Sequence, residues 1–191
     1  MARPKAFDPD TTLVRAAELF RCRGYEATSM QDLVDTLGLS RSSIYDTFGS
    51  KHDLYLQALR RYRTDAANDH AALLANDAPA MERLERMLNG IVAHALADPH
   101  GCFVANAAME VGALDAEVER SARAGLDGVT RLFTELLRTA QAEGDLTAEK
   151  DPQVLAHFLT ATAQGIRVLA KTKAGRTALQ NTIDVALSAL R

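Results

Sequence analysis

Several residue types are scarce in this 191-residue sequence, and each shortage narrows the possible folds. There is no tryptophan, aromatic residues make up only 5% of the chain, and hydrophobic residues make up 47%. A core must therefore consist mainly of Leu, Ala and Val, and abundant alanine with few β-branched runs favours helix. The two cysteines, Cys22 and Cys102, provide no disulfide framework.

Targeting and catalytic motifs are also missing. The first residues, MARPKAFDPD, contain no apolar core of the kind found in secretory signals. No stretch approaches the roughly 18 apolar residues of a membrane span. We therefore expect a soluble cytoplasmic protein with no membrane partner. Because neither a glycine-rich phosphate loop nor an H-E-x-x-H motif occurs, we expect no enzyme, no cofactor and no metal.

The charges are unevenly distributed along the chain. The net charge of −3 does not by itself suggest nucleic-acid binding. Residues 1–63 hold 10 Lys and Arg against 8 Asp and Glu, whereas residues 64–191 hold 12 against 17. A mildly basic front and an acidic back suggest that the two parts have different tasks.

Apolar residues recur with helical spacing throughout, and no alternating strand pattern, internal repeat or low-complexity linker interrupts them. We predict an all-α fold with about nine helices. A two-turn helix is expected to begin at a Thr28–Gln31 capping box and to end at Gly38 in a left-handed conformation. Ser40 and Ser50 are expected to cap the next two helices. Two short helices joined by a glycine-containing turn form a helix-turn-helix pattern.

The segment LSRSSIYDTFGSKHDLY, residues 39–55, has the chemistry of a recognition helix. Small hydroxyls and an arginine in a first turn can approach base edges, while flanking cations and hydroxyls can bind phosphates. The predicted DNA contacts are Arg3, Lys5, Thr28, Arg41, Ser42, Ser43, Tyr45, Thr47 and Lys51. Taken singly, each of these residues could equally be a helix cap or ordinary surface, and helix-turn-helix shapes also occur in proteins that bind no DNA.

Residues 11–59 resemble the N-terminal domain of TetR-family transcriptional regulators. The resemblance is carried by AAELFRCRGYEATSMQDLVDTLGLSRSSIYDTFGSKHDLYLQAL, which covers about a quarter of the chain. It implies a homodimer on a double-stranded operator, acting more often as a repressor than as an activator, with a small-molecule effector bound by the C-terminal part. The chain departs from many members at Asp46 and Thr47, where a His-Tyr pair is common. Tyr45 and Lys51 are therefore the safer predicted phosphate ligands.

The predicted organisation is a DNA-binding domain at residues 1–50 and a ligand-sensing and dimerisation domain at residues 51–191. Because one short helix reads too few bases, a second copy is expected. The family resemblance implies that the last two helices pair with their copies as a four-helix bundle. Small residues in LTATAQGIRVLA and the near-heptad spacing of Leu179, Ile183, Leu187 and Leu190 fit such a seam, although both helices could simply pack into their own core.

The predicted effector site draws on residues of the central helices, many of which would serve equally well as core. The candidates are Met87, Ile91, Cys102, Phe103, Asn106, Met109, Phe133, Phe158, Thr162 and Arg167. An inward-facing Arg167 would favour an anionic or carbonyl-bearing ligand. Cys102 follows Gly101 at an expected helix start, where the helix dipole favours a thiolate. The segment GCFVANAAMEVG resembles one in a TetR subgroup, some members of which sense electrophiles through a cysteine here, although Cys102 could equally be a small buried residue.

Two other function classes remain open from the residues. A helical adaptor could use the same helix-turn-helix to bind protein instead of DNA. A thiol enzyme or a metal site could be built from Cys102, His94 and His100, with His157 joining from a distant part of the chain. Both fit less well, because the sequence shows no oxyanion hole, no group that would orient a catalytic base and no partners that would support metal ligands.

Overall fold

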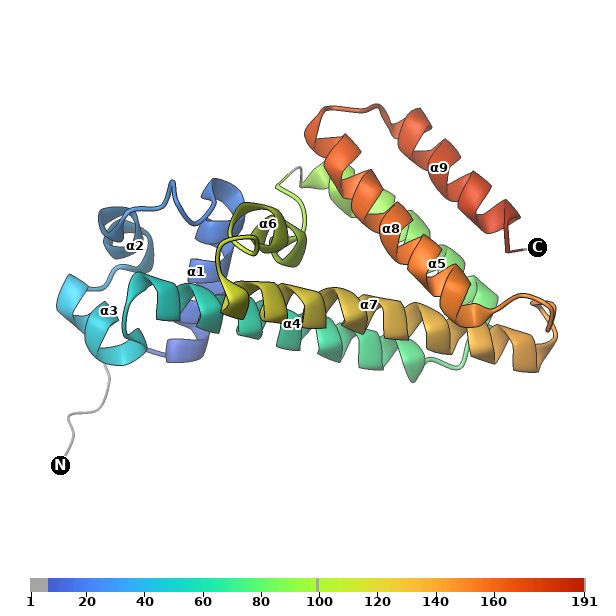
Figure 1. Ribbon diagram of the computed structural model, residues 1–191, viewed down its shortest axis with the longest axis horizontal. Coiled ribbons are helices and arrows are strands. Elements are labelled where there is room, and N and C mark those ends of the chain that lie inside the picture. The colour runs from blue at the N-terminus through green and yellow to red at the C-terminus, as the bar shows by residue number, and fades with distance from the viewer. Residues whose placement is uncertain (1–6, 99, 191) are drawn as a thin grey trace. The chain divides into compact units, whose positions relative to one another are not determined.

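The computed structural model describes residues 7–98 and 100–190. Within those residues it contains nine α-helices and no strand, so the all-α prediction is confirmed (Figure 1). The helices are α1 (Pro9–Arg23), α2 (Met30–Leu37), α3 (Arg41–Phe48), α4 (Lys51–Leu74), α5 (Ala80–Ala97), α6 (Phe103–Glu110), α7 (Ala116–Glu143), α8 (Pro152–Lys171) and α9 (Arg176–Ser188). None of these helices is both long and apolar enough to cross a membrane.

The helices pack into two compact units. The front unit contains the described residues up to Ala66 together with Phe103–Arg123, and the rear unit contains Ala67–Cys102 together with the described residues from Ala124 onward. Both α4 and α7 therefore contribute residues to each unit. The two units are defined by packing, whereas the boundary predicted at residue 50 separates DNA binding from ligand sensing and dimerisation. The two divisions differ, and the functional boundary stays a prediction.

The front unit is held together by a core that α1 to α4 share with α6. Phe20, Leu33 and Ile44 are at most 1% exposed. The ring of Tyr55 on α4 meets the ring of Phe20 edge-on at 5.0 Å and that of Phe103 at 5.3 Å. Because Phe103 is the first residue of α6, these ring contacts attach α6 to the helices that carry the helix-turn-helix.

The rear unit is a layered bundle of α5, α8, α9 and the second part of α7. One contiguous apolar cluster fills it, with alanines on α8 allowing neighbouring helices to approach closely. The leucine and isoleucine residues that were predicted to form a seam between protomers belong to this cluster: Leu179, Ile183, Leu187 and Leu190. That prediction is wrong at the level of these side chains, because all four are at most 8% exposed within their own protomer.

Candidate nucleic-acid interface and sensing residues

The helix-turn-helix is built from α2, α3 and the turn between them. Gly38 ends α2 in the left-handed conformation at φ 68° and ψ 28°, as predicted. The Ser40 hydroxyl oxygen then accepts a hydrogen bond from the Ser43 backbone N–H at 3.1 Å and caps α3. Ile44 and Phe48 are buried. The turn and the core contacts of these two residues together fix which face of α3 points to solvent.

The exposed face of α3 begins with donors and acceptors that suit base edges. Arg41 and Ser42 are exposed, and Ser43 is half-buried. The Ser40 hydroxyl lies 3.0 Å from the Ser42 hydroxyl and 2.9 Å from the Ser43 hydroxyl, so the first turn presents a small cluster of polar oxygens. Tyr45 is 45% exposed one turn further on. These side chains are therefore accessible on the surface of the front unit.

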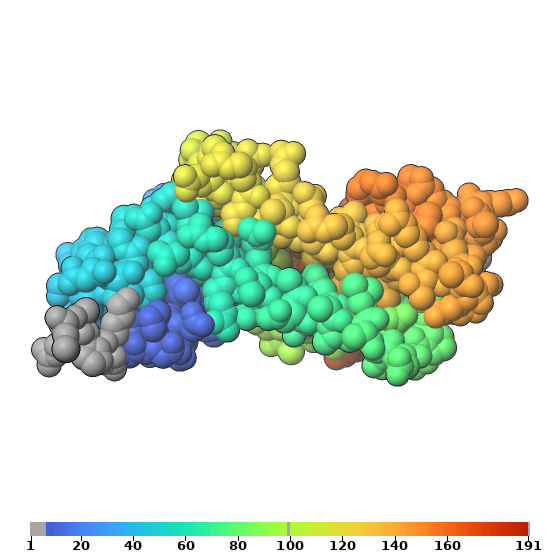
Figure 2. Space-filling view, turned by 90° about the horizontal axis from the view of Figure 1, so that it is seen from below, coloured from blue at the N-terminus to red at the C-terminus, as the bar shows by residue number. Residues whose placement is uncertain are grey.

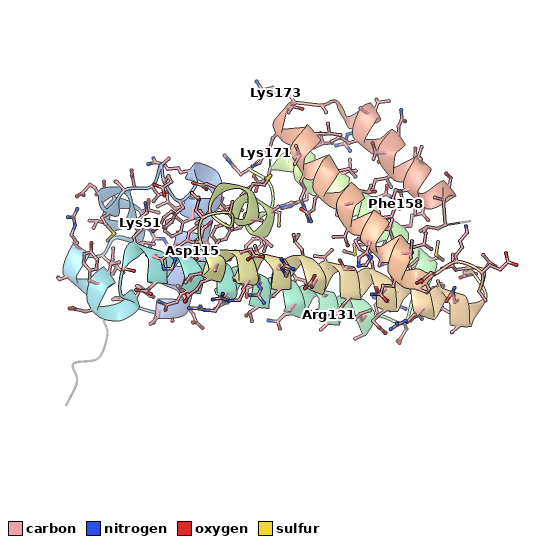
Figure 3. All side chains as sticks on the ribbon, in the orientation of Figure 1. Lys51, Asp115, Arg131, Phe158, Lys171 and Lys173 are labelled. Carbon is pink, nitrogen blue, oxygen red and sulfur yellow. The ribbon has the colours of Figure 1, made fainter. Side chains whose placement is uncertain are left out.

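Lys51 occupies the first turn of α4, where the positive helix end favours an anion. Its ammonium group lies 4.3 Å from the centre of the Tyr25 ring, a cation–π contact that holds the side chain in place. The neighbouring His52 Nε2 is 2.6 Å from a carboxylate oxygen of Asp115, the residue before α7. Figure 3 labels Lys51 and Asp115. Lys51 is therefore a positioned cation beside the α3 face. Sequence reasoning missed Tyr25, because nothing in the spacing indicated its approach to α4.

The hydroxyl of Thr28 does not point to solvent, where the predicted contact with DNA would need it. It donates a 2.6 Å hydrogen bond to the Gly24 carbonyl oxygen, and the residue is fully buried. The capping box of α2 is formed by Ser29 and Asp32, not by Thr28 and Gln31. The Ser-x-x-Asp spacing was present in the sequence one residue further on and is the signal that could have identified it.

The other predicted DNA contacts are placed as follows. Thr47 is half-buried near the end of α3, and Asp46 beside it is exposed. Arg3 and Lys5 lie outside the described residues. The assignment of individual DNA contacts stays a prediction at every one of these positions.

Two carboxylates near this surface, Asp32 on α2 and Asp53 on α4, have lowered pKa values because they cap their helices. The Ser29 hydroxyl, followed by the Ser29 backbone N–H, lowers the pKa of Asp32 below its ordinary value. The Ser50 hydroxyl and backbone N–H lower the pKa of Asp53 in the same way. Both carboxylates are therefore ionised near neutral pH, and each is engaged with the start of its own helix.

Comparisons with known protein families match both the helix-turn-helix part and the C-terminal part of the chain. Residues 13–58 match the profile described as bacterial regulatory proteins of the tetR family, and residues 80–186 match the tetracyclin repressor-like C-terminal domain. The protein belongs to the TetR family of transcriptional regulators. That family consists of DNA-binding regulators and not of enzymes.

Individual TetR-family members match all or nearly all of this chain. The uncharacterized HTH-type transcriptional regulator YezE of Bacillus subtilis is 35% identical over 203 residues, covering 100% of both chains. The repressor ComR of Escherichia coli is 29% identical, covering 99% of this chain and 90% of its own. A solved structure of a CifR cysteine mutant with a 26-base-pair operator superposes with a TM-score of 0.86 at 33% identity, covering 100% of both chains.

The residues predicted to sense a ligand in this TetR-family protein are divided between its two units. Phe103, Asn106 and Met109 lie on α6 in the front unit. Phe103 is buried among aromatic rings, and the Asn106 side-chain amide donates to the Arg21 carbonyl oxygen at 3.3 Å. Met109 is exposed. These three residues therefore face different surroundings.

The remaining sensing candidates belong to the rear unit. Ile91 and Phe133 are core residues, and Met87 packs against the same core. Phe158 and Thr162 line an open hollow of about 400 Å³ together with Asn181, Thr182 and Val185. Arg167 and the free thiol Cys102 are half-buried. The ten candidates do not gather at one described cavity, so a single pocket made of them stays a prediction.

Gln164 on α8 is a polar residue that the predicted set left out. Its side-chain oxygen and nitrogen are both buried, and neither has a hydrogen-bond partner in the described part of the chain. It lies one helical turn from Thr160, whose hydroxyl is 3.0 Å from the Thr130 hydroxyl of α7. In the sequence, Gln164 stands out, with Asn106, Thr162 and Arg167, as a polar residue in apolar surroundings.

Proposed function

We propose that the protein is a ligand-responsive transcriptional repressor that binds a palindromic operator as a homodimer and releases it when a small molecule binds. The observation that carries the proposal is the exposed first turn of α3, with Arg41 and Ser42 beside the fixed cation Lys51. ComR is named a repressor, and CifR has been solved with its operator. Because a bacterial regulator acts on the chromosome, we place the protein in the cytoplasm and assign it no catalytic role.

A homodimer through α8 and α9 is supported by the apolar side chains that these helices leave exposed. Five large apolar residues on the two helices are exposed: Val154, Phe158, Val168, Leu169 and Val185. In Figure 3, Phe158 lies on α8. Exposed apolar surface of this kind is typical of protein–protein interfaces. Two α3 helices in a dimer would read half-sites about 34–36 Å apart, which is one turn of DNA.

The proposed route of release uses α4. This helix begins at Lys51 beside α3 and continues without a break to Leu74, so it supplies residues to both compact units. A ligand that binds two tilts of α4 with different affinities would shift the population between them. The spacing of the two reading helices would then no longer match one turn of DNA. Spin-label distances between the two α3 helices that stay unchanged on release would rule this route out.

Selection of duplex DNA from a random pool tests the function directly. The selected duplex should bind with an affinity that falls with salt at a slope of about −0.9 per phosphate contacted. Lys51→Ala should weaken binding evenly across sequences and reduce the slope by about one contact, whereas Arg41→Ala should cost about 1–3 kcal/mol at one base position and relax its preference. Arg86→Ala, which removes a cation that pairs with Glu82 on α5, is the matched control and should change neither quantity.

Two outcomes would contradict the proposal. One is a pure protein that shows no affinity for any duplex at low salt, which would favour a helical adaptor that binds protein through the same helices. The other is normal binding by both Lys51→Ala and Arg41→Ala, which would show that the α3 face is not the reading surface.

A further inference from the structure

A hollow lined mainly by charged residues lies in the front unit, at residues with no assigned part in reading DNA. It has a volume of about 270 Å³ and forms where the first half of α4 adjoins the start of α7. Figure 2 shows the atoms of these two segments, teal and yellow, side by side on the surface. The lining residues are Leu56, Arg60, Arg63, Glu117, Arg120 and Ser121. All six belong to one compact unit, so their arrangement does not depend on how the two units are placed.

The charges around the hollow are unbalanced. Three guanidinium groups face one carboxylate, that of Glu117. In the described part of the chain, neither Arg60 nor Arg120 forms an ion pair. The nearby arginines behave differently, since Arg61 pairs with both Asp10 and Asp65, and Arg123 pairs with Glu119. The Asp53 carboxylate interacts electrostatically with Arg60 from outside the hollow. Three arginines against Glu117 and Asp53 still leave an excess of positive charge, which favours an anion.

Hydrogen bonding inside the hollow orients the donors. Arg63 Nη1 donates to the Ser121 hydroxyl oxygen at 3.1 Å, and this bond joins α4 to α7. The Ser121 hydroxyl keeps its own hydrogen to donate to a ligand, and Arg63 keeps its other N–H groups. The buried side chain of Leu56 contributes an apolar wall with no competing acceptor. Donors on both helices can therefore converge on one small molecule.

The geometry points to a binding site for a small anion that carries two or more negative charges on phosphoryl or carboxylate oxygens. Guanidinium groups match such oxygens with paired hydrogen bonds, and several arginines around one hollow favour a polyvalent ligand over chloride. The site is separate from the α3 face and from the candidate effector residues. Bound anion would bridge Arg60 and Arg63 on α4 to Arg120 on α7, and so would stabilise the front unit.

Inorganic pyrophosphate and citrate are suitable probes, because both are small and one carries phosphoryl oxygens while the other carries carboxylate oxygens. Isothermal titration of the full-length protein at constant ionic strength should show one site per protomer for at least one probe. Arg60→Ala and Arg120→Ala should each weaken that binding by about tenfold or more, since each removes a charge-assisted hydrogen bond. Glu117→Gln should tighten it, because the repelling carboxylate is lost.

Arg123→Ala is the matched control, because it removes an arginine of the same helix that is already paired with Glu119. Its binding should stay within about twofold of the unmodified protein, since the lost charge lies outside the hollow and is already paired with Glu119. Circular dichroism checks that each variant is folded. Glu117→Gln keeps all three arginines, so it remains decisive even if an arginine variant proves unstable.

Three results would overturn the inference. The first is the absence of saturable binding of both probes, and the second is an equal loss of affinity in Arg123→Ala and Arg60→Ala, which would indicate diffuse surface charge. The third is a salt dependence of operator binding that falls by about 0.9 per arginine removed from the hollow, which would assign these arginines to DNA phosphates. Because probe titration needs no DNA, the site can be tested whether or not the proposed repressor function holds.

Discussion

Gly24 offers a sharp test of how α6 is attached to the helix-turn-helix. It ends α1 with φ 87° and ψ 168°, a backbone region open almost exclusively to glycine. A Cβ atom at this position would lie 2.8 Å from both carboxylate oxygens of Glu110, the last residue of α6. That carboxylate accepts a 3.0 Å hydrogen bond from the Glu26 backbone N–H. Gly24→Ala therefore strains the backbone and displaces a contact between the end of α6 and the loop that joins α1 to α2.

The expected cost of Gly24→Ala has two parts. The backbone strain contributes about 1–3 kcal/mol. The Glu110 side chain is flexible and can swing away from the new methyl group, so the second part is the loss of one exposed charge-assisted hydrogen bond, about 1 kcal/mol. Gly38 is the comparison site, because it is also at positive φ but has no atom within 4 Å of the position that a methyl group would occupy. Gly38→Ala should cost about 1–2 kcal/mol from backbone strain alone.

A double-mutant cycle separates the two parts. Urea unfolding followed by far-ultraviolet circular dichroism suits a chain without tryptophan, with protomer concentration held fixed because dimerisation alters apparent stability. In a Glu110→Ala background the cost of Gly24→Ala should fall by about 1 kcal/mol, well above the usual additivity error of about 0.3–0.5 kcal/mol. The cost of Gly38→Ala should be the same in both backgrounds. Equal costs of Gly24→Ala with and without Glu110 would refute the reasoning.

Two further predictions concern acid stability and assembly. The folded-state pKa values of Asp32 and Asp53 lie below the ordinary value of 3.8, so their stabilisation is complete above pH 3.8 and is lost as the pH falls below it. Asp53→Asn should make the acid unfolding curve shallower, and an unchanged curve would contradict the capping role. Val185 is 66% exposed on α9, so Val185→Asp should convert the proposed dimer to monomer in analytical ultracentrifugation. Leu114→Asp, at a 92% exposed site in the front unit, should leave the assembly unchanged, and a Val185→Asp protein that still dimerises would exclude this interface.

Much of the local structure could be predicted from the sequence, because helix ends depend on residues a few positions apart. Ser40 and Gly38 fulfil their predicted roles at the two sides of the turn. The Ser50–Asp53 pair closes the start of α4 through a 2.7 Å hydrogen bond between hydroxyl and carboxylate. The one local error, a capping box at Thr28 instead of Ser29, arose because two overlapping spacings both fit the pattern. The choice between them followed from the buried hydrogen bond of Thr28 to Gly24.

The all-helical fold, the helix ends around the helix-turn-helix and the family could be read from the amino-acid sequence alone, since periodicity and caps act within a few turns of chain. Helix packing sets which apolar side of α9 faces the protomer's own core, because Ile183 and Val185 are both apolar but only Ile183 is buried. It alone brought Lys51 over Tyr25, and Arg60 and Arg63 next to Arg120. These groupings depend on how distant helices pack, and spacing along one helix carries no information about the charges that another helix places opposite it.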